Sequence, residues 1–188
     1  MKEYNDYFSY LRKRSKLGYF YRKFWLYPFI CRHVRGRVLD VGCGIGDMLS
    51  YRPESVGVDI NPATVNFCQG RGLNALLMEK DRLPFSNEVF DSIILDNVLE
   101  HIEKPLPLLA EINRVLKNNG ILIVGVPGRK GYKSDPDHKI FYDEKMLEAV
   151  SLKSRFTVEK FFYLPVNLKI LDKIMKQFCI YAILKKSE

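Results

Sequence analysis

VLDVGCGIGD, residues 38–47, is the stretch that decides the fold. An apolar run ends at Val41, glycines follow at positions 42, 44 and 46, and a segment with Met48 and Leu49 comes next. A strand that leads through a glycine loop into a helix lets a ligand approach the backbone closely, at the carboxyl edge of an open α/β sheet. The stretch therefore predicts a ligand-binding loop, and a plain tight turn is the alternative.

Short apolar runs alternate with helical patterns along the rest of the chain. The runs that predict strands cover residues 37–41, 55–60, 73–78, 90–96, 120–127, 155–164 and 178–186. The predicted helices begin at Asn61-Pro62, span 105–120 with Gly120 as the closing residue, and lie near 143–150 and over 167–177. Alternation of this kind predicts a single α/β domain with a parallel sheet and crossover helices.

Residues 1–36 alternate aromatic and basic residues and predict a helical cap of one or two amphipathic helices, broken near Gly18 and Pro28. The net charge of the chain is +8, and much of the excess precedes the glycine loop, at Arg12, Lys13, Arg14, Lys16, Arg22, Lys23, Arg32, Arg35 and Arg37. Such an arm suits nucleic acid, an anionic membrane surface or an acidic substrate, and a solvated basic helix is the alternative.

The cysteines and the apolar stretches indicate the cellular compartment of the protein. Four cysteines, at positions 31, 43, 68 and 179, have neither the spacing of a zinc site nor the density of a disulfide framework. The start of the chain has no signal-peptide core, and the apolar stretches fall short of the roughly 20 residues that span a bilayer. We expect a cytoplasmic protein.

The charged residues beside the glycine loop limit the kinds of ligand that it can bind. A dinucleotide fingerprint needs glycine or alanine at position 47, which is Asp47, and the Gly-Lys-Ser/Thr of a phosphate-binding loop is absent. Asp40 and Asp47 would repel a pyrophosphate and attract an ammonium or a sulfonium. Asp59 ends the second predicted strand, 19 residues after Asp40, where a carboxylate can accept both hydrogen bonds of a ribose diol.

Four segments in order resemble one known family. They are VLDVGCGIG, VGVDI, EKDRLPFSNEVFDSIILDNVLEHI and LAEINRVLKNNGILIVGVP, within residues 36–150. The chain resembles the class I S-adenosylmethionine-dependent methyltransferases of type 11, similar to enzymes of ubiquinone and menaquinone biosynthesis. The resemblance implies a Rossmann-like, doubly wound, mostly parallel seven-stranded sheet with flanking helices and an antiparallel last strand. It also implies that residues 37–188 form the domain that binds S-adenosyl-L-methionine, whose product is S-adenosyl-L-homocysteine.

The resemblance also implies roles for single residues. The loop with Gly42, Cys43, Gly44 and Gly46 would hold the methionine part of the cofactor, and Asp40 would bind its ammonium group. Asp59 would bind the ribose, Ile60 would pack on the adenine, and Glu79 with Lys80 would contact the adenine amino group. Asp96 would lie beside the methyl group. The segment from Gly46 to the second strand is about four residues shorter than in the family. We therefore expect the first helix to lose roughly one turn.

Catalysis on a hydroxyl acceptor calls for a general base. The candidates are His138, which Asp135 and Asp137 could orient, and His101, with Asp96 beside the methyl group. The alternatives are ordinary: Asp96 as a helix cap, His101 in packing, and His138 as a cap of the helix that follows Phe141. No carboxylate cluster in the sequence calls for a metal ion, so no metal is expected.

The predicted function is methyl transfer to a small-molecule acceptor, a hydroxyl of a sugar, quinone-like or lipid-linked compound. The aromatic arm would cover an apolar acceptor, with its basic residues on phosphate head groups or an anionic membrane; the alternative is that it only covers the sheet edge. The arm's aromatic residues are Tyr7, Phe8, Tyr10, Tyr19, Phe20, Tyr21, Phe24 and Trp25. Nucleic-acid or protein methylation and a catalytically silent cofactor-binding module are the competing functions, and nucleic acid is disfavoured because LDNVLEH lacks an Asn/Asp-Pro-Pro-aromatic motif.

Overall fold

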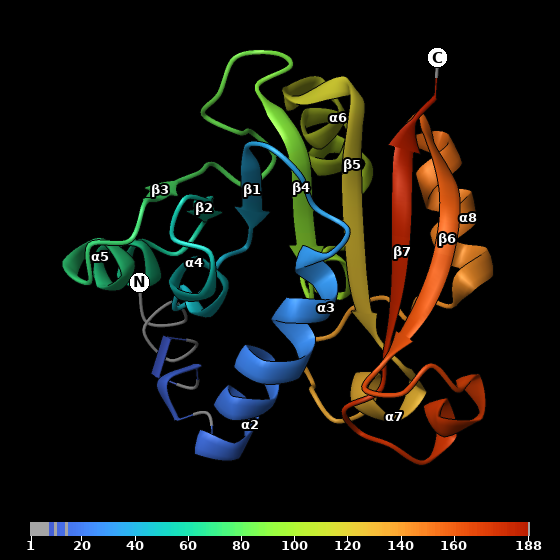
Figure 1. The fold of residues 1–188 in the computed structure, drawn as a ribbon. Helices are drawn as coiled ribbons and strands as arrows, with labels where there is room; N and C mark the ends of the chain where they lie inside the picture. The colour runs from blue at the N-terminus through green and yellow to red at the C-terminus, as the bar shows by residue number, and fades with distance from the viewer. Residues whose placement is uncertain (1–7, 10, 14, 188) are drawn as a thin grey trace.

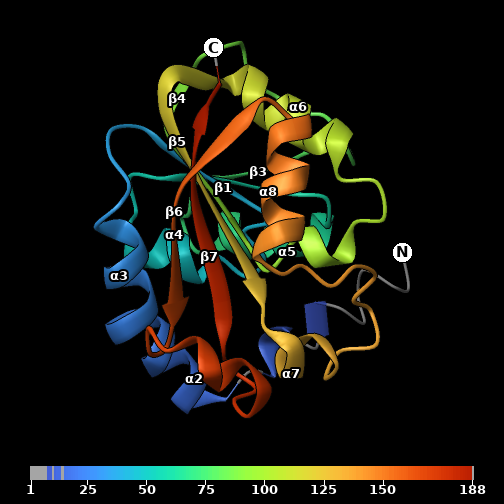
Figure 2. The same cartoon turned by 90° about the vertical axis from the view of Figure 1, so that its right-hand side faces the viewer.

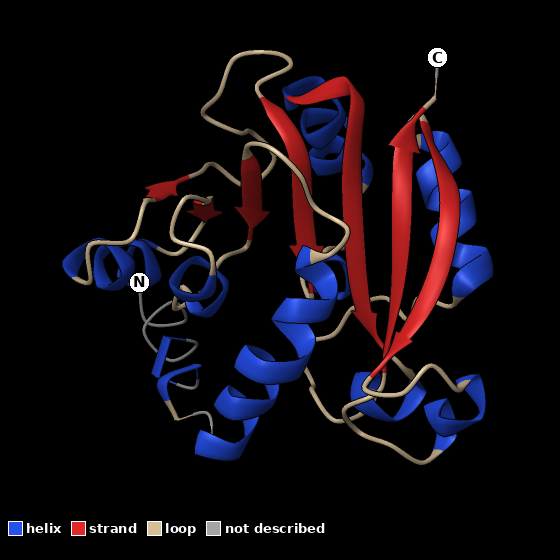
Figure 3. Cartoon of the chain, in the orientation of Figure 1, coloured by secondary structure: helices blue, strands red, loops and turns tan. Residues whose placement is uncertain are grey.

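A computed structural model describes residues 8–9, 11–13 and 15–187 of the chain. Its centre is a seven-stranded sheet of order β3-β2-β1-β4-β5-β7-β6, drawn in red in Figure 3. The strands are β1 Val38–Val41, β2 Val56–Asp59, β3 Ala75–Leu77, β4 Phe90–Asp96, β5 Leu116–Pro127, β6 Phe156–Leu164 and β7 Cys179–Lys186. The pairs among β1 to β5 are parallel, and β7 runs antiparallel to both β5 and β6. The predicted fold class is confirmed.

Helices cover both faces of this sheet (Figures 1 and 2). They are α2 Lys16–Tyr21, η1 Arg22–Leu26, α3 Tyr27–Cys31, α4 Asp47–Tyr51, α5 Pro62–Gly70, η2 Leu99–His101, α6 Leu106–Val115, α7 Arg129–Tyr132, α8 Glu144–Lys153 and η3 Lys169–Lys173. Alternate residues of the central strands point to opposite faces of the sheet. Ile93 and Leu122 pack in the hydrophobic cluster that includes α6 and α8, whereas Ile94 and Ile123 pack in the cluster that includes η1 and α3. Strand β4 is thus buried on both sides, as its apolar sequence requires.

The N-terminal helical segment runs without a break from Lys16 to Cys31 through α2, η1 and α3. The predicted interruptions near Gly18 and Pro28 are wrong. Gly18 lies in the first turn of α2, where its N–H donates to the side chain of the cap residue Ser15. Ahead of Pro28 the helix widens into the π-helical turn η1, in which the Tyr27 N–H reaches back to the Arg22 carbonyl. A widened turn accommodates a proline that has no N–H to donate.

Three predicted helices along the middle of the chain have the expected places, and one ends early. Asn61 caps α5 through its side chain, α8 covers the segment expected near 143–150, and α4 is the short first helix. Helix α6 ends at Val115 rather than at Gly120, because Leu116 turns extended and pairs with Phe90. Gly120 instead lies in the irregular start of β5, where a Cβ would meet the Leu116 side chain.

The segment 167–177 forms only the short 3-10 turn η3, so the predicted helix there is wrong. Two of its polar groups bond to α7. The Asp172 carboxylate accepts from the Arg129 N–H at 2.5 Å, and the Lys130 ammonium donates to the Ile174 carbonyl at 2.9 Å. Leu171 and Met175 pack against the core, whereas Leu168 and Ile174 are exposed.

The N-terminal segment shares a hydrophobic core with the sheet. Leu26, Tyr27 and Ile30 pack in one cluster with Phe162 of β6 and Tyr181 of β7. The division into a cap of residues 1–36 and a domain of residues 37–188 remains a prediction, and residues 1–7, 10 and 14 of that cap, including Tyr7 and Tyr10, lie outside the described residues. Within the described part of the chain, every helix is too short or too polar to cross a bilayer.

Candidate active site

The glycine loop turns sharply between β1 and α4. Gly42, Gly44 and Gly46 all have positive φ, at 77°, 52° and 75°, a conformation that favours glycine. At Gly42 a Cβ would also meet the Val98 side chain. The loop is fixed from the neighbouring strand, because the Gly44 N–H donates to the Asp59 carboxylate at 2.8 Å. Sequence VLDVGCGIG therefore produces a preformed backbone cradle.

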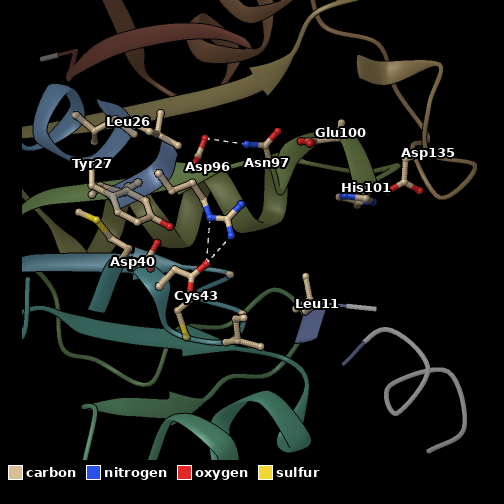
Figure 4. A pocket seen from close by; sticks show the side chains of 18 of the residues that line it. Leu11, Leu26, Tyr27, Asp40, Cys43, Asp96, Asn97, Glu100, His101 and Asp135 are labelled. Atoms are coloured by element: carbon tan, nitrogen blue, oxygen red, sulfur yellow. Dashed lines mark hydrogen bonds and ion pairs between the residues drawn. The ribbon is translucent and has the colours of Figure 1, made fainter. Parts of the chain in front are cut away.

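A pocket of about 290 Å³ opens beside this loop, at the carboxyl ends of β1 and β4 (Figure 4). Its walls come from four parts of the chain: the N-terminal helical segment, the glycine loop, the end of β4 with η2, and the loop after α7. The lining residues are Leu11, Arg22, Leu26, Tyr27, Ile30, Asp40, Gly42, Cys43, Gly44, Ile45, Asp47, Met48, Ile94, Asp96, Asn97, Glu100, His101, Asp135 and His138.

Seven of the predicted site residues line this pocket, and five do not. Those in the lining are Asp40, Gly42, Cys43, Gly44, Asp96, His101 and His138; those outside it are Gly46, Asp59, Ile60, Glu79 and Lys80. The second group continues along the same sheet edge, because the Met78 N–H at the end of β3 donates to the Asp59 carbonyl. Ile60 is 44% exposed, and Glu79 and Lys80 are exposed. The role of each of these twelve residues stays a prediction.

The acidic residues near the loop differ in their surroundings. Asp40 is buried, and burial together with the charges of Asp96, Asp59 and Asp47 raises its pKa to about 8. Asp47 forms an ion pair with Arg22, whose Nε and Nη2 each lie 3.0 Å from its Oδ2. Part of the negative charge that the sequence assigns to the loop is therefore matched by the protein itself. Arg22 lies among aromatic and basic residues of the N-terminal segment, and no spacing pattern in the sequence singles it out.

Asp96 is held in place from the far end of the chain. The Tyr181 hydroxyl of β7 donates to its Oδ1 at 2.8 Å, and the Asn97 amide donates to the same oxygen at 3.0 Å. Gly125 of β5 lies between the two side chains, and a Cβ there would meet both the Asp96 carboxylate and the Tyr181 ring. The carboxylate at the end of β4 is thus fixed in orientation at the pocket wall.

Glu100, His101 and His138 come together in the part of the pocket wall that η2 and the loop after α7 form. His138 Nδ1 contacts the Tyr132 carbonyl at 2.8 Å, and its Nε2 lies 3.8 Å from Glu100 Oε1. His101 Nδ1 contacts the Asp137 carbonyl at 3.3 Å, and the two imidazole rings are 4.7 Å apart. Main-chain carbonyls therefore orient both rings, where the Asp135 and Asp137 side chains were expected to orient His138. Glu100 was not predicted from the sequence as a site residue. An acidic residue inside the apolar run VLEHI is the signal that could have indicated it.

Comparison with known proteins identifies the class to which this fold and pocket belong. Residues 39–124 match the protein family described as Methyltransferase domain. A SAM-dependent methyltransferase of Thermotoga maritima, titled a possible histamine N-methyltransferase, superposes with a TM-score of 0.76 over 99% of this chain and 100% of its own, at 20% identity. At that identity the likeness concerns the fold alone. Residues 39–124 therefore form a methyltransferase domain, and the fold around them is that of the class I S-adenosylmethionine-dependent methyltransferases.

Relatives in sequence have varied names. An uncharacterized protein of Methanocaldococcus jannaschii, MJ1123, is 32% identical over 126 residues, 66% of this chain and 57% of that protein. A probable phthiotriol/phenolphthiotriol dimycocerosates methyltransferase 2 of Mycobacterium ulcerans is 37% identical over 95 residues, 45% of this chain and 36% of its own length. The names of further relatives include tRNA methyltransferases. The chain thus spans less than two thirds of the length of the first two relatives. The methyl acceptors that the relatives' names give differ from one another.

Proposed function

We propose that this protein transfers a methyl group from S-adenosylmethionine to a hydroxyl of a small, lipid-linked acceptor. One observation carries the proposal: a single pocket joins the preformed glycine cradle and its buried carboxylate to a wall of Asp96, His101 and His138. The cradle suits the cofactor, and the wall suits an acceptor whose hydroxyl must lose a proton.

The residues present fit the cofactor. A positive-φ glycine loop leaves room for a ligand against the backbone. Burial, and then the charges of neighbouring aspartates, raise the pKa of Asp40 to about 8, and a bound ammonium would lower this pKa again. Asp40 would hold the ammonium, the backbone from Gly42 to Gly46 the methionine part, Asp59 the ribose, Ile60 the adenine face, and Glu79 with Lys80 the adenine edge. When bound, S-adenosylmethionine supplies a methyl group on a sulfonium.

The chain's own contribution is to position the acceptor and to receive its proton. The buried side chains of Leu26 and Tyr27 exclude water from one side of the pocket. Positioning of the reactants can supply on the order of 7 to 11 kcal/mol of the barrier. Because the Tyr132 and Asp137 carbonyls accept from Nδ1 of His138 and His101, the Nε2 atoms of both rings keep a lone pair for the proton of the acceptor.

An exposed apolar surface, here called the apolar rim, favours a lipid-linked acceptor. It is formed by the N-terminal helical segment, which also lines the pocket, and by the loop around η3, and these two segments lie at the same end of the molecule (Figures 1 and 2). This apolar rim comprises Leu17, Phe20, Phe24, Trp25, Val166, Leu168, Ile170 and Ile174, each at least 45% exposed. The Trp25 indole N–H donates to the Pro165 carbonyl at 2.9 Å and joins its two halves. An exposed apolar patch of this kind is typical of a lipid or partner contact.

The charge around the apolar rim matches an anionic head group. Lys16 and Lys23 flank its helical half, and Lys169, Lys173 and Lys176 flank the η3 half, all of them exposed. Lysines near an anionic membrane surface contribute about 1 kcal/mol each. The rim therefore combines an apolar contact with electrostatic attraction, the two components of peripheral membrane binding.

Cofactor binding is tested by Asp59→Ala. Calorimetric titration with S-adenosylhomocysteine should give a dissociation constant raised at least tenfold, because the ribose loses its acceptor and the Gly44 and Asn61 N–H groups lose theirs. The control is Glu148→Ala, an exposed carboxylate on α8, which should bind like the wild type. Wild-type protein that shows no heat and no thermal shift at millimolar S-adenosylhomocysteine would rule out the proposal.

The acceptor class is tested with the single tryptophan of the chain, Trp25, as a fluorescent reporter. Vesicles that contain anionic lipid should shift its emission to the blue, neutral vesicles should do so less, and a Phe20→Ser, Phe24→Ser double variant should lose the effect. A steeply salt-dependent affinity for RNA without a vesicle effect would point to nucleic-acid methylation instead. Vesicle binding with no methyl transfer to any extracted lipid would favour a silent module.

A further inference from the structure

We propose that Glu100, His101 and His138 bind a divalent transition-metal ion on the acceptor side of the pocket. Each of the three residues offers one ligand atom, and these atoms lie within 4.8 Å of one another. Two imidazoles and one carboxylate form the ligand set of many zinc, iron and manganese sites that leave a coordination position open. This proposal revises the expectation, drawn from the sequence, that the protein has no metal site.

The two histidines have the arrangement that metal-binding imidazoles adopt. A carbonyl oxygen only accepts, so the contacts of Nδ1 with the Tyr132 and Asp137 carbonyls make Nδ1 the protonated nitrogen of His138 and of His101. Nε2 is left as the basic nitrogen in both rings. A metal-bound histidine commonly donates its second ring N–H to a carbonyl or carboxylate in this way.

Glu100 supplies the negative charge. Its side chain is 1% exposed, and neither carboxylate oxygen has a hydrogen-bond partner within the described part of the chain. The closest basic group that forms a pair with it is His138 Nε2, at 3.8 Å. A buried carboxylate without hydrogen bonds is costly unless a cation compensates it. A metal ion between Glu100 and the two Nε2 atoms would satisfy all three groups at once.

The backbone holds these ligands together without the ion. The Lys139 and Ile140 N–H groups both donate to the Glu100 carbonyl, at 2.7 and 3.1 Å, so the segment that carries His138 is tied to η2. His101 follows Glu100 in the chain, and the His101 and His138 rings meet edge to face. The site is therefore preorganised, which lowers the conformational cost of binding an ion.

The ligand set selects among metals. Mg²⁺ and Ca²⁺ prefer oxygen ligands, whereas imidazole nitrogens favour transition metals such as Zn²⁺. All three ligand residues line the pocket that Asp96 also lines, so an open coordination position would face the acceptor. On the proposed function, an acceptor hydroxyl bound there would release its proton to water at a lower pH. Its oxygen would then form a bond to the methyl carbon while the carbon–sulfur bond breaks and S-adenosylhomocysteine leaves. His101 and His138 would act as ligands rather than as general bases.

The test is calorimetric titration of the full chain, stripped with a chelator, with Zn²⁺ and with Mn²⁺. We expect one ion per chain at micromolar affinity or tighter for Zn²⁺. Glu100→Gln, His101→Ala and His138→Ala should each weaken binding at least 100-fold. Glu148→Gln, exposed on α8, and His33→Ala, which removes a histidine that packs on Phe162, are the matched controls and should bind as the wild type does.

The titration with Mn²⁺ is the control for binding to cysteine, because the four free thiols are ligands that favour Zn²⁺ over Mn²⁺. Circular dichroism of each variant confirms that it folds, and Glu100→Gln is expected to fold because it removes a buried charge. No ion binding by the wild type, or equal binding by Glu100→Gln and Glu148→Gln, would overturn the proposal. S-adenosylhomocysteine should still bind Glu100→Gln, so failure of the metal site is separable from failure of the proposed function.

Discussion

At the scale of single residues, carboxylates that look alike in the sequence have different states in the structure. Asp40 is buried beside other acids, Asp47 is paired with Arg22, and Asp59 accepts from the backbone N–H groups of Gly44 and Asn61. Burial also raises the pKa of Asp59, while its hydrogen bonds lower it. Of these three carboxylates, Asp40 is therefore the one whose charge we expect to respond most to a bound cation.

Asp40 should make the stability of the ligand-free protein depend on pH. Its pKa is raised to about 8 in the folded state, largely by burial, so the folded chain keeps a proton that the unfolded chain releases. Stability from this group is greatest at acid pH and is lost as the pH rises toward 8, by about 1.4 kcal/mol per pH unit. Urea unfolding at pH 6 and pH 8 should therefore show a larger loss for the wild type than for Asp40→Asn.

Ligand provides the control for this pH effect. On the proposed function, the ammonium of S-adenosylhomocysteine would lie beside Asp40 and stabilise its carboxylate. Saturating ligand should therefore flatten the wild-type pH dependence and leave that of Asp40→Asn nearly unchanged. Equal pH dependence of the two proteins without ligand would contradict the assignment of the effect to Asp40.

At the scale of elements, the central strands fix the pocket wall at Asp96 by close packing. Strand β5 lies between β4 and β7, and its Gly125 pairs with Asp96 on one side and Tyr181 on the other. The absence of a side chain at Gly125 is what lets the Tyr181 hydroxyl reach Asp96. The orientation of Asp96 is thus a property of three strands together.

Gly125→Ala should destabilise the protein and disturb this orientation. The added Cβ would press on the Asp96 carboxylate and the Tyr181 ring, and overpacking of a core typically costs about 1 to 3 kcal/mol. Gly70→Ala is the matched control, because nothing lies within 4 Å of its Cβ at the end of α5. Guanidinium unfolding of both variants measures the difference; equal stabilities would mean that β5 relaxes around the methyl group.

At the scale of the whole molecule, the N-terminal and C-terminal parts of the chain pack against each other. The N-terminal helical segment packs its buried face on β6 and β7, and it supplies Arg22, Leu26 and Tyr27 to the pocket. The apolar rim likewise combines residues of that segment with residues of the η3 loop. The pocket residues of the N-terminal segment thus rest on β6 and β7, and neither end builds the apolar rim alone.

Phe162→Ala should therefore weaken the whole molecule in a single cooperative step. Phe162 stacks on Tyr181 with ring centroids 5.1 Å apart and also contacts Phe29 of α3, and truncation of a buried phenylalanine costs about 3 to 5 kcal/mol. Phe20→Ala, on a side chain that is 53% exposed, should change stability by less than about 0.5 kcal/mol. Two separate unfolding transitions in Phe162→Ala would mean that the N-terminal segment folds as an independent unit.

The sequence by itself determined the sheet and the glycine loop, because both depend on local patterns: apolar runs that form strands, and glycines where φ is positive. It also led to the carboxyl-edge residues Asp40, Asp59 and Asp96, since parallel strands end at the same edge. The helix over 167–177 and the breaks at Gly18 and Pro28 were wrong, because contacts with α7 and a widened turn outweigh local propensity. Only the tertiary structure decided that Arg22 neutralises Asp47, that Tyr181 orients Asp96, and that Glu100 meets His138, because these contacts join residues 25 to 85 positions apart, beyond the reach of any local pattern.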